Sequence, residues 1–134
     1  MAHPVIHFEL GAPDGADLAR FYEKLFGWEV TPSGPEYWLL VPGGGGIGGG
    51  VMQTSGGMPP YLTIYIAVDD LEQALRDAQA LGASSAVPPM EVPGVGRFAL
   101  VNDPAGHLIG LMEQVAAPPE QVAAPSGQVA TAPE

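Results

Sequence analysis

An internal repeat restricts the fold of this chain more than any other feature of its sequence. Each copy begins with an alternating segment, PVIHFEL or TIYIAV, whose apolar side chains occupy one face of a strand. A helical pattern and three short strands follow in both copies. Tyr65 lies 58 positions after His7, and Glu113 lies 60 positions after Gln53. These similar offsets predict an α+β fold made of two tandem βαβββ units, about 4–54 and 60–114.

Both helical segments carry recognisable start and stop signals. Asp14 is a suitable N-cap for the first helix, and Gly27 ends it. Asp70 is the expected N-cap of the second helix, with Gln73 at the capping-box position, and Gly82 is expected to end this helix. We expect each helix to place its apolar stripe against a sheet. In the first helix this stripe consists of Leu18, Phe21, Tyr22, Leu25 and Phe26.

The last twenty residues differ in composition from the rest. From Gln114 the chain reads QVAAPPE, QVAAPSG, QVATAPE, and after Met112 it contains no aromatic residue, Leu or Ile. Such a segment buries too little apolar surface to offset the entropy of ordering it. We therefore expect one folded domain, 1–114, and a disordered repeat tail, 115–134. A scaffold or regulatory role for that tail remains an alternative.

Charge and composition exclude several classes of function. Fifteen acidic residues against four basic ones give a net charge of −11, so the chain has no basic patch for nucleic acid or an anionic membrane. The chain has no cysteine, and a metal ion would need His, Asp, Glu, Gln or Tyr ligands. No apolar run approaches the roughly 20 residues that span a bilayer. We expect a cytoplasmic protein.

The strand faces predict a trough between the two half-sheets. Each helix covers the Ile, Phe and Leu side of its sheet, which leaves the other side partly polar. The expected lining comprises His7, Glu9, Tyr65 and Glu113. Arg97 is expected to face the same trough and to hold an anionic substrate. A trough of this kind is where a small molecule binds.

Aligning the two units brings four side chains to equivalent positions. The segment IGGGVMQ (47–53) matches LIGLMEQ (108–114), which sets Gln53 on Glu113 while His7 falls on Tyr65. One imidazole, one amide, one phenol and one carboxylate are thereby expected around a divalent ion. Tyr65 is the weakest of these ligands, because a phenol has an unperturbed pKa of about 10.

The two units, together with the segments HFEL, YIAVDDLEQAL, FYEKLFGW and GRFALVNDPAGHLIGLME, resemble the vicinal oxygen chelate superfamily of glyoxalases, bleomycin resistance proteins and extradiol dioxygenases. The resemblance covers about 4–114. It implies metal ligands from the first and last strands of each unit, where His7 and Glu113 match the usual types. Gln53 replaces the more usual carboxylate, and Tyr65 replaces a second histidine. The implied ion is divalent Zn, Ni, Mn, Fe or Co.

Two functions follow from this resemblance. The first is a metal-dependent lyase, isomerase or dioxygenase acting on a small oxygenated metabolite, with Glu113 or Glu9 as the proton-transfer base and Tyr65 orienting the substrate. The second is a metal-free protein that sequesters a drug-like ligand. In that case Tyr65, with Tyr37 or Trp38, stacks on a planar molecule.

The resemblance also implies a homodimer. Small members of the superfamily commonly build each cleft from the first unit of one chain and the second unit of another. His7 and Gln53 would then meet the partner's Tyr65 and the partner's Glu113. Closure of the cleft within a single chain is the alternative.

Overall fold

A computed structural model describes residues 2–114, and the expected disordered tail lies outside these residues. The predicted α+β fold of two βαβββ units is confirmed. The first unit comprises β1 (Val5–Ala12), α1 (Gly15–Phe26), β2 (Glu29–Pro32), β3 (Tyr37–Val41) and β4 (Gly49–Gln53). The second comprises β5 (Tyr61–Ala67), α2 (Leu71–Ala80), β6 (Ser84–Val92), β7 (Gly96–Asn102) and β8 (Leu108–Gln114).

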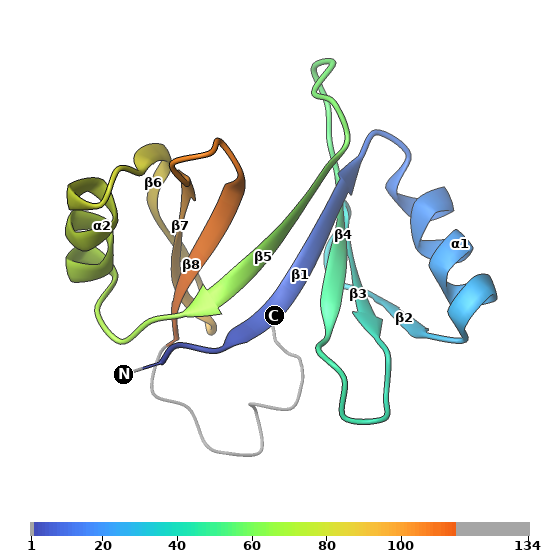
Figure 1. Cartoon of the computed structure of the whole chain (residues 1–134). Helices are drawn as coiled ribbons and strands as arrows, with labels where there is room; N and C mark the ends of the chain where they lie inside the picture. Colours follow the sequence, from blue (N-terminus) through green and yellow to red (C-terminus); the bar gives the residue numbers. More distant parts are fainter. Residues whose placement is uncertain (1, 115–134) are drawn as a thin grey trace.

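All eight strands form one mixed sheet in the order β2-β3-β4-β1-β5-β8-β7-β6. The two units meet where β1 pairs with β5 in the antiparallel direction. Within each unit the first and last strands are parallel neighbours, β1 with β4 and β5 with β8. Figure 1 shows β1 and β5 crossing the middle of the molecule, with α1 and α2 at its opposite outer sides.

Both helices cover the same face of the sheet, and each packs on its own hydrophobic core. Directly opposed residues of an antiparallel pair point to the same side, as Phe8 and Ile64 do at the β1–β5 junction. Phe8 packs into the first core and Ile66, two residues beyond Ile64, into the second. The buried centres are Ala19, Leu40 and Val51 in the first unit and Leu71, Ala99, Val101 and Leu111 in the second.

The helix ends agree with the sequence signals in part. Gly27 ends α1 in the left-handed conformation, as expected, but Asp14 makes no side-chain capping bond. Asp70 accepts a hydrogen bond of 3.1 Å from the backbone N–H of Gln73, which confirms the predicted cap of α2. That helix ends at Ala80, before Gly82. Neither helix in the described part of the chain is long and apolar enough to cross a membrane.

The apolar stripe of α1 departs from the expectation that it would cover the sheet. Phe21, Leu25 and Phe26 are 53%, 57% and 55% exposed. Leu18 packs against the first core, and the fully buried residues of α1 are the small Gly15 and Ala19. Phe21, Leu25 and Phe26 remain largely exposed at the surface of the molecule.

Candidate functional site

Five polar and aromatic side chains gather on the helix-free face of the sheet, where the two units meet. We call them the tyrosine cluster; its members are His7, Glu9, Tyr37, Tyr61 and Tyr65. His7 lies directly opposite Tyr65 in the β1–β5 register. Their rings contact each other edge to face, with centroids 5.8 Å apart. Both units therefore contribute side chains to one cluster within this chain.

Glu9 is the centre of this cluster. Its side chain is only 9% exposed, and it accepts hydrogen bonds from the hydroxyls of Tyr37 at 3.0 Å and Tyr61 at 2.7 Å. Tyr37 also lies 2.9 Å from Nε2 of His7, which joins His7, Tyr37 and Glu9 in one chain of hydrogen bonds. A buried carboxyl so fully partnered is held in a single geometry.

Burial shifts the pKa values of this cluster toward the neutral forms. Desolvation raises the pKa of Glu9, although its bonds from Tyr61 and Tyr37 act in the opposite direction. Desolvation also lowers the pKa of His7 to about 4. The pKa values of Tyr37, Tyr61 and Tyr65 are raised by desolvation first and by the charge of Glu9 second. At neutral pH the imidazole and the phenols are uncharged.

The hydrogen-bond chain has two complete arrangements, because a tyrosine hydroxyl donates only one proton. With Glu9 ionised, Tyr37 donates to Glu9 and Nε2–H of His7 donates to Tyr37. With Glu9 protonated, Glu9 donates to Tyr37, and Tyr37 donates to Nε2 of His7. The second ring nitrogen of a neutral His7 is an acceptor in the first arrangement and a donor in the second.

Glycines on the neighbouring strands make room for the rings. Gly50 of β4 lies beside Glu9, and Gly110 of β8 lies beside Tyr65. A Cβ atom at Gly50 would overlap the ring and hydroxyl of Tyr37, and one at Gly110 would overlap the ring of Tyr65. These two positions are the cluster's neighbours on β4 and β8, and tyrosine rings fill the space above them.

Gln53 and Glu113 were expected to join His7, but they lie on the opposite, helix-bearing face. Gln53 follows the core residue Val51 at a spacing of two, and its Cβ borders the start of α1 near Gly15. Glu113 follows the core residue Leu111 at the same spacing. Gln53 and Glu113 therefore occupy the core-bearing face of β4 and β8, and the predicted four-residue arrangement around His7 is wrong. Since side chains alternate, a shift of one position reverses the face.

Glu113 instead anchors the start of α2. It accepts a hydrogen bond of 2.9 Å from the backbone N–H of Leu71, and Arg97 contacts it through Nε at 3.0 Å and Nη2 at 2.8 Å. The Leu71 N–H first, and Arg97 second, hold the pKa of Glu113 below its usual range. A carboxylate at a helix N-terminus also interacts favourably with the helix dipole.

Arg97 and Trp38 also lie away from the cluster, which corrects the expectation that they bind a ligand in the trough. Arg97 shares the helix-bearing face with Glu113 and forms a bidentate pair with Glu72 at 2.6 and 2.8 Å. Trp38 packs on the first core beside Gly15. Of the two neighbouring aromatic residues in β3, only Tyr37 belongs to the cluster.

The donor set fits a divalent ion poorly. Among residues 2–114, the cluster supplies one imidazole and one carboxylate, and both are already bonded to Tyr37. Protein metal sites generally use three or more protein ligands. A separate group of carboxylates, Asp70, Glu72 and Glu113, lies at the start of α2, but Arg97 already occupies two of them. The residues present do not form the four-ligand site expected from the sequence.

Tyr61 is the member of the cluster that sequence reasoning missed. The alternating segment TIYIAV begins at Thr63, whereas β5 begins two residues earlier, at Tyr61. Extending the alternation by two residues puts Tyr61 on the same face as Thr63 and Tyr65. Its ring covers Gly11 of β1, so the pairing of the two strands depends on that glycine.

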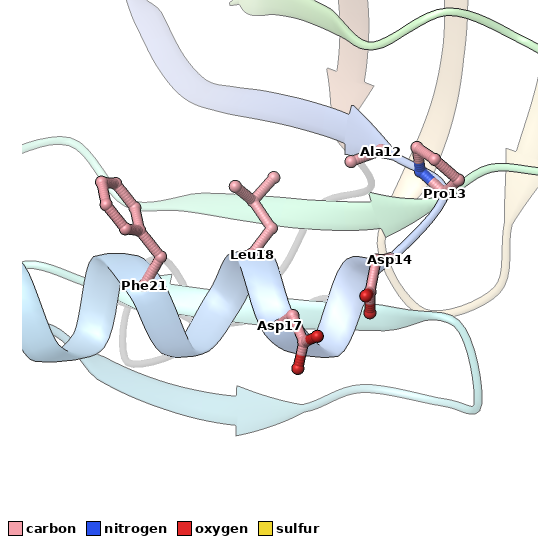
Figure 2. Close-up of a pocket in the computed structure, with 6 residues that line it drawn as sticks. All are labelled: Ala12, Pro13, Asp14, Asp17, Leu18 and Phe21. Carbon is pink, nitrogen blue, oxygen red and sulfur yellow. The ribbon is translucent and has the colours of Figure 1, made fainter.

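A hollow lies beside helix α1, apart from the cluster. An open depression of about 430 Å³ is lined by Ala12, Pro13, Asp14, Asp17, Leu18 and Phe21. Figure 2 shows Leu18 and Phe21 rising from the same side of α1, with the carboxylate of Asp17 turned away from them. This depression contains no member of the tyrosine cluster and belongs to the surface of α1.

Comparison with known proteins gives a consistent family. The family model described as a glyoxalase-like domain matches residues 6–112. The anthracycline biosynthesis protein DnrV of Streptomyces peucetius is 32% identical over 117 residues, which cover 74% of this chain but only 42% of that protein. This chain thus spans less than half the length of that relative.

Solved structures agree on the fold. Methylmalonyl-CoA epimerase from Mycobacterium tuberculosis matches with a TM-score of 0.64 at 16% identity, over 84% of this chain and 88% of that one. The Mn(II)-bound glyoxalase from Novosphingobium aromaticivorans matches with a TM-score of 0.59 at 20% identity, over 86% of this chain and 41% of that one. The match over nearly all of residues 2–114, together with the paired βαβββ units, means that this chain belongs to the glyoxalase-like domain family of the vicinal oxygen chelate superfamily.

Proposed function

We propose that this chain is a metal-independent binding protein for a small, planar molecule that carries oxygen atoms, and that the tyrosine cluster is its binding site. The observation that carries the proposal is Glu9, a carboxyl 9% exposed that two tyrosine hydroxyls hold beside His7. Buried polar groups cost stability unless they are fully partnered, and their concentration on one face favours a recognition role. The glyoxalase-like family supplies the fold for such a site, not the ligand.

The chemistry of the cluster suggests what it recognises. Tyr61 and His7 are partly exposed, so a flat ligand can stack on a ring while a ligand oxygen exchanges a hydrogen bond with the imidazole. The similarity to an anthracycline biosynthesis protein supports an aromatic ligand bearing hydroxyl or carbonyl groups. That Glu9 acts as a proton-transfer base stays a prediction. In a binding protein, Glu9 sets the donor or acceptor state of His7 through Tyr37.

A divalent metal is the competing explanation, because a structural relative is a Mn(II)-bound glyoxalase. The mismatch of donors weighs against it here. Glycine occupies the positions on β4 and β8 beside the cluster, and Gln53 and Glu113 lie behind the sheet. We therefore derive no step through a metal ion.

The test is calorimetric titration of EDTA-treated protein with an anthracycline, with glyoxylate as a non-aromatic comparison. We expect the anthracycline to bind and the His7→Gln and Tyr61→Phe variants to bind about tenfold more weakly. His7→Gln removes the imidazole ring that faces the ligand, and Tyr61→Phe removes one of the two hydroxyls that hold Glu9. Tyr22→Phe is the matched control, because Tyr22 stacks on Trp28 outside the cluster.

Measuring the metal content of the protein tests the competing explanation, a bound divalent ion. The protein would be loaded with Mn, Fe, Co, Ni or Zn and dialysed, and its metal content compared with that of the His7→Gln variant. One ion per chain, retained by the wild type and lost in the variant, would overturn the metal-independent proposal. Equal binding of the anthracycline by the wild type and the His7→Gln and Tyr61→Phe variants would remove the cluster as the site.

A further inference from the structure

The helix-free face of the sheet continues beyond the tyrosine cluster as an apolar surface of the second unit. Tyr65 lies in register with Gly110 of β8, and Gly110 with Leu100 of β7. Two positions along the same strands, Met112 lies opposite Phe98. Opposed residues share a side of the sheet, as do residues two positions apart, so these side chains lie on the side of Tyr65. We call this surface the apolar shelf; its members are Phe98, Leu100, Met112 and Met90, which lies opposite Phe98 on β6.

An aromatic contact joins the shelf to the cluster. The ring of Tyr65 meets His7 at 5.8 Å and Phe98 at 6.1 Å between centroids, in both cases edge to face. A Cβ atom at Gly110 would overlap the Tyr65 ring, so this ring leans over β8 toward the shelf. Met90 is 51% exposed, and the other three shelf members are partly exposed. The rings from His7 to Phe98 therefore form one continuous, partly open surface.

The shelf lies on the uncharged half of this face. The described strands β5–β8 carry three acidic or basic side chains, Glu91, Arg97 and Glu113. Both glutamates lie opposite Arg97, which places all three on the helix-bearing side. The first unit does the reverse, because Glu9 of β1 and Glu29 of β2, which directly precedes a core residue, lie on the helix-free side. The second unit thus offers a surface that removes no charge from water when it is covered.

We propose that the apolar shelf is a second part of the ligand site and binds the hydrocarbon portion of a fused-ring molecule whose oxygen atoms are held at the tyrosine cluster. This inference rests on the proposed binding function and adds the shape of the ligand. His7, Tyr65, Gly110 and Leu100 form one row across four strands. At the usual strand spacing this row is about 14 Å long, so a single ring covers only the end at the cluster, whereas fused rings extend onto the shelf.

The side chains of the shelf suit a flat hydrocarbon. Phe98 offers a ring, and Met90 and Met112 offer flexible thioethers that contact aromatic rings favourably. Burial of apolar surface stabilises a complex roughly in proportion to the area covered. Affinity should therefore increase with the number of fused rings, while the hydrogen bonds at the cluster stay the same.

The first experiment compares two oxygenated aromatic compounds by equilibrium dialysis against the EDTA-treated full chain. Catechol has a single ring, and 1,4-dihydroxyanthraquinone has a fused-ring system. We expect the anthraquinone to bind at least about tenfold more tightly, and Phe98→Ala to remove most of this advantage while changing the affinity for catechol by less than about twofold. Phe21→Ala is the matched control, because Phe21 is 53% exposed on α1, away from the shelf.

A second pair of variants avoids any effect on the core. Met90→Gln should weaken binding of the anthraquinone by about threefold, because it replaces an apolar contact with a polar group. Met58→Gln should leave binding unchanged. Met90 and Met58 are 51% and 53% exposed, so both proteins should fold as the wild type does, and only the former belongs to the shelf.

The outcomes separate this inference from the proposed function. If His7→Gln and Tyr61→Phe weaken binding of both compounds while Phe98→Ala and Met90→Gln weaken neither, the cluster remains the site and the shelf is overturned. If Phe98→Ala weakens binding of the anthraquinone and the cluster variants change nothing, the shelf is supported and the cluster is removed. Equal affinity for the two compounds would overturn the shelf. So would an affinity for the anthraquinone that falls as protein concentration rises, because a second copy would then cover the surface.

Discussion

Within the tyrosine cluster, folding shifts the pKa values of His7 and Glu9 in opposite directions. His7 has a lowered pKa, so folding favours its neutral form, whereas Glu9 has a raised pKa, so folding favours its protonated form. Each shift is caused mainly by burial. The site is thus tuned by where β1 places these residues in the sheet, and it needs no strong charge nearby.

Lowering the pH should reveal how much the neutral form of His7 contributes to the stability of the folded protein. Its pKa falls from 6.5 in the unfolded chain to about 4 in the folded one, so the stability it contributes is complete above pH 6.5 and lost as pH falls to 4. The corresponding change is about 3 kcal/mol. Urea unfolding at pH 7 and pH 4 should show a loss in the wild type that exceeds the loss in His7→Gln by most of this amount. His3→Gln, at an exposed position, is the control.

Glu9 should give the opposite slope. Its raised pKa stabilises the folded protein at low pH, and this stability is lost as pH rises from 4.5 through the pKa of the folded state. The melting temperature of Glu9→Gln relative to wild type should therefore increase as pH rises from 5 to 8. A difference that stays constant over this range would show that Glu9 ionises in the folded protein as it does in the unfolded chain.

At the level of elements, strands β4 and β8 approach the cluster closely only because they carry glycine. Gly110→Ala should lower stability by about 1–3 kcal/mol, the usual effect of overpacking, and should displace the ring of Tyr65. Gly48→Ala is the matched control, since a Cβ there meets only ordinary contact at 3.6 Å. Thermal unfolding and near-ultraviolet circular dichroism would measure both effects. Equal stability of the two variants would contradict the close approach at Gly110.

The carboxylate of Glu113 bonds to the first backbone N–H of helix α2. A substitution can therefore distinguish this structural role from a role in ligand binding. Glu113→Gln should lower the melting temperature, because it weakens the bonds to Arg97 and to the Leu71 N–H, but it should leave ligand affinity unchanged. The same titration used for the His7 variants measures affinity. A loss of binding comparable to that of His7→Gln would return Glu113 to the site.

The order of elements could be read from the sequence, but the set of site residues only in part. The repeat, the helix end at Gly27 and the cap at Asp70 depend on local spacing, which the sequence displays directly. The sequence does not reveal which residues of β4 and β8 face the cluster. Gly50 and Gly110 have no side chain to mark that face, and only the structure shows that a tyrosine ring packs over each of them. The ion pair between Arg97 of β7 and Glu72 of α2 joins two elements that are far apart in the sequence, so local sequence patterns do not predict it.

Viewed as a whole, the molecule has two hydrophobic cores joined through the β1–β5 pairing. The first core contains buried residues of the first unit alone, and the second contains those of the second. Within residues 2–114, α1 packs mainly on β1 to β4 and α2 on β6 to β8, so the two units meet chiefly at the central strands and the tyrosine cluster. Such an arrangement favours partial unfolding of one unit before the other.

Amide hydrogen exchange on variants of the two cores should detect partial unfolding of one unit before the other. Leu71 is fully buried, and Leu71→Ala should cost about 2–5 kcal/mol. We expect amide protection to fall more in β7 and β8 than in β3 and β4. Val51→Ala, in the other core, should give the reverse pattern. Equal loss of protection in both units for either variant would mean that the domain unfolds as one cooperative body.

The position of the cluster on the β1–β5 junction also bears on how recognition can diversify. His7, Glu9 and Tyr37 come from the first unit, and Tyr61 and Tyr65 from the second. Each half of the repeat therefore contributes its own share of the proposed ligand site, supported by its own core. Exchanging one half between related chains would create a new combination of contacts while the inherited half keeps its packing, so duplication gives this scaffold a combinatorial route to new ligands.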